Sequence, residues 1–574
     1  MILRRLYLYL VSAASLALLA AGLCLLGATV LLFVFDDPSA QQSRTQLAAF
    51  TAMTLVALPV WGIHFWFARR FALRDPHERA SAIRRLYLYL ACLALSVGAT
   101  IALAITLGDL LRPVLDRCTL PLIVPLGKPG LPEVGCPPTQ TWLTISQTAW
   151  ALLVLGALWA FHFRAADRDF AAVGADGVAA TLRRWYMYPA LLIGLLMVLS
   201  GASNTIALGW LRVLNTQTPA YQFVYMGDTL GLTIAGALLW SVHSRAIAVR
   251  HGADDRHSTL RALQGFIAVA IGMAVALVGA SQILYYLLAR VLGVNDPGGV
   301  AGNDVLSGLA MPGSLLLVYG AAWLLVRRRL ARDAGTQEAD RQAAIRRLYN
   351  NLACLVSLAA WAIGAGGVLW TLAEQIEAPL IGVNPSSWRD PLSLWVTLLV
   401  AGAAVWAAHW RPSPWAADRQ SLSRRLYVWA ALLASVLVLL GAGVGLLTSL
   451  FTQVFSAHPR LADPSNLDFG HYLAVMLVAA AVGLYHWRIL RADVAARPPK
   501  IAMHKMEAEP VAAAGPDTAP APSAPPAPRE FVTPETRRYI LAVTDATDDD
   551  VHQALGNLPP HAGYQLTPAD EGAG

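Results

Sequence analysis

Five histidines close apolar segments of the chain, and imidazole is the side chain best suited to bind haem iron or a transition metal. Four of them follow a tryptophan by three residues, which places both rings on one face of a helix, and the fifth lacks that tryptophan. These residues are Trp61 and His64, Trp159 and His162, Trp240 and His243, Trp406 and His409, and His486. Imidazoles from two helices can share one haem, so a haem-binding redox protein is one hypothesis. The simpler interpretation, which we favour, is that each histidine bonds the last carbonyls of its helix and complements the helix dipole.

Sequence motifs of catalysis are absent from the chain. It contains no Cys-x-x-Cys-His, no His-Glu-x-x-His, no Gly-x-Ser-x-Gly and no glycine-rich phosphate loop. We therefore expect a protein that is not an enzyme and that binds neither a cofactor nor a metal ion.

One carboxylate, Asp228, follows an apolar stretch and is the best candidate for an ionisable group inside the membrane. Such groups mark ion and substrate pathways in transporters. The alternative is that Asp228 caps the start of a helix, as we also expect of Asp304, Asp390 and Asp468. We favour the helix cap.

A second motif, Arg-Arg-Leu-Tyr, opens five apolar segments, with tryptophan in place of leucine in one of them. Its residues are Arg4, Arg5 and Tyr7; Arg84, Arg85 and Tyr87; Arg183, Arg184 and Tyr186; Arg346, Arg347 and Tyr349; and Arg424, Arg425 and Tyr427. Arginines at a helix entry can extend to lipid phosphates while the tyrosine lies among the headgroups. A more specific hypothesis is a site for an anionic lipid or a protein partner where several copies meet.

The elements that carry these motifs are predicted to be transmembrane helices. Hydrophobic residues make up 56% of the 574 residues and charged residues 14%, and the mean hydropathy is +0.51. The net charge of +7 is spread between apolar segments, a pattern of membrane insertion and not of nucleic-acid binding. We predict an all-α polytopic membrane protein with about twelve spans, near residues 6–33, 47–68, 86–108, 142–163, 186–208, 220–243, 263–290, 306–326, 348–372, 392–410, 426–451 and 471–487.

The two motifs alternate, and this predicts six copies of a two-helix repeat. The predicted repeats are residues 1–80, 81–180, 181–256, 257–342, 343–420 and 421–493. The fourth copy is degenerate: Ala262 replaces the second arginine and Val326 replaces the histidine.

The distribution of basic residues predicts the orientation. In this scheme 32 arginines and lysines lie on the side where the repeats start and 8 lie on the opposite side. Because positive residues concentrate on the cytoplasmic side, both termini are expected in the cytoplasm and the protein in the plasma membrane. Cys118 and Cys136 bracket the longest outside loop, where they are a candidate disulfide.

The C-terminal part of the chain differs in composition from the rest. Residues 494–530 are rich in proline and alanine, which predicts a disordered linker. Residues 531–574 contain one segment typical of a strand and one of a short helix, and we expect a small cytoplasmic element.

The paired motifs, Arg-Arg-Leu-Tyr-x-Tyr-Leu opening one helix and Trp-x-x-His-Trp-Arg closing the next, resemble those of the bacterial membrane family called domain of unknown function 5671. That resemblance implies a membrane location and repeated two-helix units, with no activity or catalytic residues to transfer. We therefore expect a non-catalytic scaffold or accessory subunit that binds anionic lipid or a protein partner. A transporter or channel for a small apolar or uncharged substrate is the alternative.

Overall fold

The computed structural model describes residues 2–115, 141–174, 177–214, 225–251, 258–295, 305–334, 340–380, 387–410, 421–455 and 469–496, with Asp255, Pro297, Asn384 and Arg419. By its contacts the chain divides into two units, Met1–Pro499 and Lys500–Gly574. The predicted disulfide at Cys118 and Cys136, and the predicted tail elements, lie outside the described residues.

Twelve helices of the described residues are long and apolar enough to cross a membrane, which confirms the predicted number. In chain order they are α1 (Ile2–Val34), α2 (Arg44–Arg74), α4 (Ala82–Leu115), α5 (Thr141–Val173), α6 (Val178–Val213), α7 (Met226–His251), α8 (Thr259–Val291), α10 (Ala310–Ala334), α11 (Asp340–Leu380), α12 (Arg389–His409), α14 (Leu422–Phe455) and α15 (Phe469–Ala495). Long runs of alanine and leucine explain this uniformity, because an apolar segment satisfies all its backbone hydrogen bonds by itself in lipid only as a helix.

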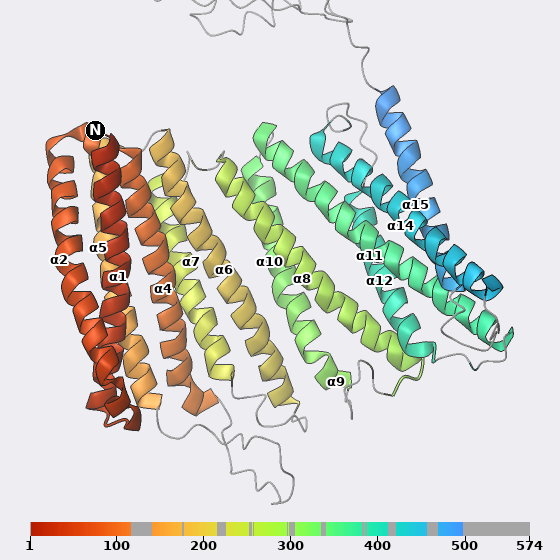
Figure 1. Cartoon of the computed structure of the whole chain (residues 1–574), viewed down its shortest axis with the longest axis horizontal. Helices are drawn as coiled ribbons and strands as arrows, with labels where there is room; N and C mark the ends of the chain where they lie inside the picture. The colour runs from red at the N-terminus through yellow and green to blue at the C-terminus, as the bar shows by residue number, and fades with distance from the viewer. Residues whose placement is uncertain are drawn as a thin grey trace, which may run out of the picture. The chain divides into compact units, whose positions relative to one another are not determined.

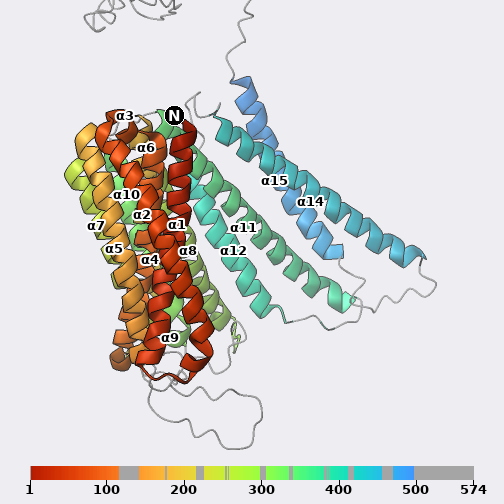
Figure 2. The ribbon, with the colours of Figure 1, turned by 60° about the vertical axis from the view of Figure 1, so that its left-hand side comes forward.

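Consecutive helices pack as pairs, α1 with α2, α4 with α5, α6 with α7, α8 with α10, α11 with α12, and α14 with α15. Neighbouring pairs also contact one another; α4 packs against α7, for example, and α11 against α15. Figure 1 shows the pairs following one another in chain order, and α14 lies beside α15 there and in Figure 2. The chain is thus a multi-pass helical membrane protein, and the interpretation of these pairs as copies of one repeat stays a prediction.

The helices extend beyond the apolar segments from which they were predicted. The predicted span 86–108 is part of α4, which runs from Ala82 to Leu115. Charged residues continue these helices past the apolar run, since arginine is a good helix former. The short helices η1 (Pro38–Ser43), α3 (Pro76–Arg79) and α9 (Val305–Gly308) lie between the long ones.

Glycines let neighbouring helices approach until their backbones touch. A Cβ atom added at Gly231 of α7 would lie 2.5 Å from the carbonyl oxygen of Ala104 and 2.6 Å from the nitrogen of Gly108, both on α4. At Gly364 of α11 an added Cβ would lie 2.3 Å from the nitrogen of Leu399 on α12. These crossings need glycine because any side chain would force the helices apart.

Candidate functional site

The two motifs meet at one end of the helix pairs, which we call the motif end. There the tyrosine on the first helix of a pair lies beside the histidine on the second. The separations between Tyr Oη and His Nε2 are 3.3 Å for Tyr7 and His64, 3.0 Å for Tyr87 and His162, 2.8 Å for Tyr186 and His243, 3.3 Å for Tyr349 and His409, and 2.9 Å for Tyr427 and His486. The two motifs therefore join the two helices of one pair.

The tryptophan of the second motif reaches the next pair along the chain. The indole N–H of Trp61 donates to Tyr87 Oη at 3.2 Å. Trp159 donates in the same way to Tyr186 at 3.1 Å, and Trp406 to Tyr427 at 3.0 Å. A single Trp-x-x-His segment thus holds its own pair together through histidine and the following pair through tryptophan.

The proton positions in this network follow from its acceptors. Each histidine Nδ1 lies 2.7–2.9 Å from the backbone carbonyl four residues earlier, and a carbonyl can only accept. Nδ1 therefore carries the proton in a neutral imidazole and Nε2 accepts from the tyrosine hydroxyl. Both ring nitrogens are engaged, so haem ligation by these histidines would require breaking a hydrogen bond.

The expectation that these histidines end their helices is wrong for four of the five. His64 lies ten residues before the last residue of α2, Arg74, and only His409 is the last residue of its helix. The apolar segment ends at the histidine while the helix continues. Each histidine accordingly bonds a carbonyl inside its helix and not an unpaired terminal one.

The arginines of the first motif form ion pairs inside the protein. In five of the six pairs a motif-end arginine meets a carboxylate from the end of the same pair. The separations are 2.8 Å for Arg5 and Glu78, 2.6 Å for Arg84 and Asp169, 2.8 Å for Arg184 and Asp255, 2.8 Å for Arg261 and Asp333, and 2.7 Å for Arg424 and Asp493. Arg4 also contacts Glu78, and Arg183 also contacts Asp255.

Burial shows that several of these arginines do not reach lipid. Arg84 and Arg183 are buried together with their carboxylates, Arg424 is itself buried, and Arg85 is fully buried. Arg85 donates to the carbonyls of Asp169 and Gly174, 3.1 Å each, and so caps the end of α5. The expectation that the motif arginines bind lipid phosphates is therefore wrong for these four.

The fourth helix pair, α8 and α10, keeps the ion pair and lacks the tyrosine–histidine contact. Arg261 binds Asp333 with two hydrogen bonds, of 2.8 and 3.0 Å. Gln264 and Val326 occupy the positions of the tyrosine and the histidine. Both partners of that contact are thus absent together in this pair.

Asp228 lies at the opposite end of the helix pairs. It is in the first turn of α7 and not at the N-cap, so the expected cap is wrong. Its carboxylate accepts from Arg112 of α4 at 3.0 and 3.1 Å, and Arg112 also lies 3.1 Å from the buried Asp109. Asp228 therefore joins α7 to α4.

The other three aspartates were also expected to cap helices. Asp390 is likewise in the first turn of α12 and accepts from Tyr285 at 2.5 Å. Asp304 and Asp468 are outside the described residues.

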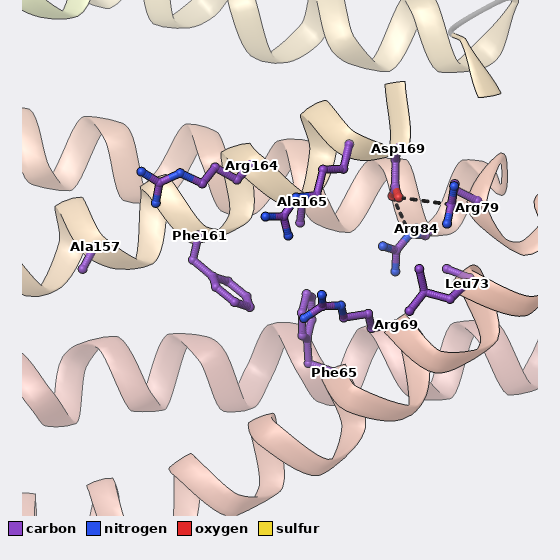
Figure 3. A pocket seen from close by; sticks show the side chains of 12 residues that line it. Phe65, Arg69, Leu73, Arg79, Arg84, Ala157, Phe161, Arg164, Ala165 and Asp169 are labelled. Carbon is purple, nitrogen blue, oxygen red and sulfur yellow. Dashed lines mark hydrogen bonds and ion pairs between the residues drawn. The ribbon is translucent and has the colours of Figure 1, made fainter. Parts of the chain in front are cut away.

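A pocket of about 610 Å³ opens at the motif end between the first two helix pairs. Its charged lining comprises Arg69 of α2, Arg79 of α3, Arg84 of α4, and Arg164, Arg168 and Asp169 of α5. Figure 3 shows Arg69, Phe65 and Phe161 facing the space between the helices, with Asp169 held by Arg79 and Arg84. We call this the cationic pocket.

A second pocket, of about 420 Å³, lies between α11, α12, α14 and α15. Apolar side chains dominate its lining, with Trp370, Trp395 and His471 as its largest rings. Asp228 lines neither of the two pockets. Among the described residues no three His, Cys, Asp or Glu side chains are placed to hold a metal ion.

Sequence reasoning missed the carboxylates that hold the arginines. A signal existed for some of them: Asp169 and Asp493 each follow the motif histidine by seven residues, and Asp333 follows Val326 by seven. Seven residues make two helical turns, which returns to the same face. Glu78 and Asp255 lie beyond their helices and have no fixed spacing.

Comparison with known proteins identifies one family. The model of the family described as "Domain of unknown function (DUF5671)" matches residues 5–127 and 347–481. No curated protein and no solved structure matches the chain. Residues 5–127 and 347–481 therefore belong to DUF5671, the family that the paired motifs resemble.

Proposed function

We propose that the chain is a non-catalytic membrane scaffold that binds anionic lipids at its motif end and offers that face to a protein partner. In this proposal the motif end and both termini face the cytoplasm, in the plasma membrane. The count of 32 basic residues on that side against 8 on the other supports the orientation.

The observation that carries the proposal is that arginines on the first and on the second helices of the pairs differ in their partners. In five of the six helix pairs an arginine on the first helix binds a carboxylate of the protein, whereas the exposed arginines named below, all on second helices, bind none among the described residues. These unpaired arginines are Arg69, Arg70 and Arg74 of α2, Arg164 and Arg168 of α5, Arg245 of α7, Arg327 and Arg328 of α10, and Arg488 and Arg491 of α15. A row of exposed, uncompensated guanidiniums at helix ends attracts anionic headgroups.

Lipid co-purification tests this proposal. The full chain is extracted, and its bound lipids are quantified by headgroup class against those of the source membrane. We expect anionic lipids to be enriched. A variant with Arg327, Arg328, Arg488 and Arg491 all changed to Gln should lose much of this enrichment, because each such arginine contributes about 1 kcal/mol at an anionic surface. Bound lipids of the same composition as the membrane would overturn the proposal.

The second pocket, between α11, α12, α14 and α15, supports one alternative function, transport of a small apolar substrate. Its volume, about 420 Å³, is within the roughly 300–1,000 Å³ of small-molecule sites. Introducing bulk at Gly366, which has open space around it and lines this pocket, tests that alternative. For a transporter, Gly366→Phe should block uptake of an apolar fluorescent probe into proteoliposomes, and for a scaffold the chain should show no uptake to block.

A further inference from the structure

The cationic pocket holds more positive charge than its own residues neutralise. Asp169 is its single carboxylate, and Arg84 binds it at 2.6 Å. The remaining four arginines, Arg69, Arg79, Arg164 and Arg168, form no closer ion pair among the described residues than the 3.7 Å between Arg79 Nε and Asp169 Oδ1. Four like charges around one cavity repel one another unless an anion lies between them.

One of these guanidiniums has an unsatisfied donor. Arg79 Nε is buried, and it has no hydrogen-bond partner among the described residues. A buried donor of a charged group without an acceptor is costly, and proteins rarely retain one without a use for it. An acceptor in the pocket would satisfy it.

The pocket is apolar at one end and charged at the other. Along α5 its lining runs from Ala157 and Phe161, within the apolar span, to Asp169 beyond it. Twelve residues of helix correspond to about 18 Å. Phe65 and Phe161, with ring centroids 5.3 Å apart, lie on the apolar side. Such a site suits a ligand with a charged head and a hydrocarbon body, oriented as the lipids of one leaflet are.

We propose that the cationic pocket binds a membrane lipid whose phosphoryl headgroup carries at least two negative charges. The phosphoryl oxygens accept from Arg79, Arg164 and their neighbours, and the acyl chains lie along Phe65 and Phe161. The proposal rests on the proposed function and adds a single defined site to it. A singly charged headgroup would leave most of the four guanidiniums uncompensated.

The pocket depends on features of the first two helix pairs alone. Arg79 belongs to α3, a four-residue helix that follows α2. At the position two residues after the motif histidine, Trp66 stands in the first pair, where Arg164 stands in the second. The site therefore lies where the sequence departs from the shared pattern.

Lipid affinity in nanodiscs tests the proposal, with phosphatidic acid as the dianionic probe in phosphatidylcholine. The pocket variant is Arg79→Gln with Arg164→Gln. The matched control is Arg70→Gln with Arg74→Gln, which removes two exposed arginines of α2 that do not line the pocket. We expect the pocket variant to bind phosphatidic acid about tenfold more weakly, as the loss of charge-assisted hydrogen bonds predicts, and the control within about twofold of the unchanged chain.

Each of the other possible results of this experiment overturns one stated part of the proposal. Equal losses in both variants would mean that surface charge alone binds lipid, so the pocket site fails while the scaffold stands. Equal affinity for phosphatidylglycerol, with one charge, would overturn the dianionic headgroup. Displacement of the lipid by inorganic phosphate at comparable concentration would show a free anion as the ligand. If the unchanged chain does not distinguish phosphatidic acid from phosphatidylcholine, the proposed function fails as well.

Discussion

At the scale of single residues, one tyrosine hydroxyl can serve two helix pairs. Tyr186 Oη accepts from Trp159 at 3.1 Å and donates to His243 Nε2, 2.8 Å away. Its side chain and that of His243 are fully buried. Because they are buried, each of these groups depends on the others for its hydrogen bond.

Replacing this hydroxyl is expected to destabilise the protein. Tyr186→Phe leaves the Trp159 donor and the His243 acceptor unpaired, which should cost about 1–2 kcal/mol in unfolding free energy. The control is Tyr7→Phe, because Tyr7 is 59% exposed and has a single contact of 3.3 Å. Thermal unfolding in detergent should show a lower midpoint for the first variant alone; equal midpoints would contradict the network.

The buried ion pairs give a second prediction at this scale. Asp169→Asn removes the negative partner of Arg84, which is 3% exposed. A buried guanidinium without a counter-ion should cost about 3–5 kcal/mol. Changing both residues, Arg84→Met with Asp169→Leu, should recover much of this loss in the same unfolding assay. A double variant less stable than Asp169→Asn would show that the pair does not act as a unit.

At the scale of helices, the number and type of elements were predictable and their partners were not. Apolar runs long enough to cross a bilayer predict the twelve helices, because lipid leaves the backbone no alternative. Hydropathy does not specify which face of a helix meets which neighbour. The prediction that Arg84 binds lipid phosphates was therefore wrong, and the prediction for His162 missed its partner Tyr87, since each of the two residues has a partner on another helix.

The cationic pocket could not be predicted from the sequence for a related reason. Its arginines come from α2, α3, α4 and α5, and only the packing of two helix pairs brings them together. In the sequence they resemble the other basic clusters that follow each apolar segment. By contrast, the basic residues on the two predicted sides could be counted from the sequence, because that count does not depend on which helices are in contact.

The crossing of α4 and α7 allows a test at the scale of helices. Gly231→Ala would bring a Cβ atom within 2.5 Å of the Ala104 carbonyl oxygen, whereas Gly62→Ala meets nothing within 4 Å. We expect the first substitution to cost about 1–3 kcal/mol through overpacking and the second to be neutral or slightly stabilising, since alanine favours helix. Detergent unfolding of both variants checks this, and a tolerated Gly231→Ala would contradict the close approach.

At the scale of the whole molecule, the proposed orientation is open to a direct test. Two reporters are fused, in separate experiments, after residue 574. A fluorescent protein that folds only in the cytoplasm should be active there, and an enzyme that is active only after export should be inactive. The reason is that the predicted topology has 32 basic residues on the side where the repeats start and 8 on the other. Activity of an exported phosphatase at the same position would reverse the assignment.

The motif tryptophans and tyrosines fasten neighbouring helix pairs to one another. A double-mutant cycle on Trp159→Phe and Tyr186→Phe measures that fastening, since these two residues share one hydrogen bond between α5 and α6. Unfolding free energies of both single variants and the double variant give the coupling energy. We predict a coupling of about 0.5–1 kcal/mol in the membrane-protein range. Strictly additive effects of the two substitutions on the unfolding free energy would contradict a role of this hydrogen bond in joining the helix pairs.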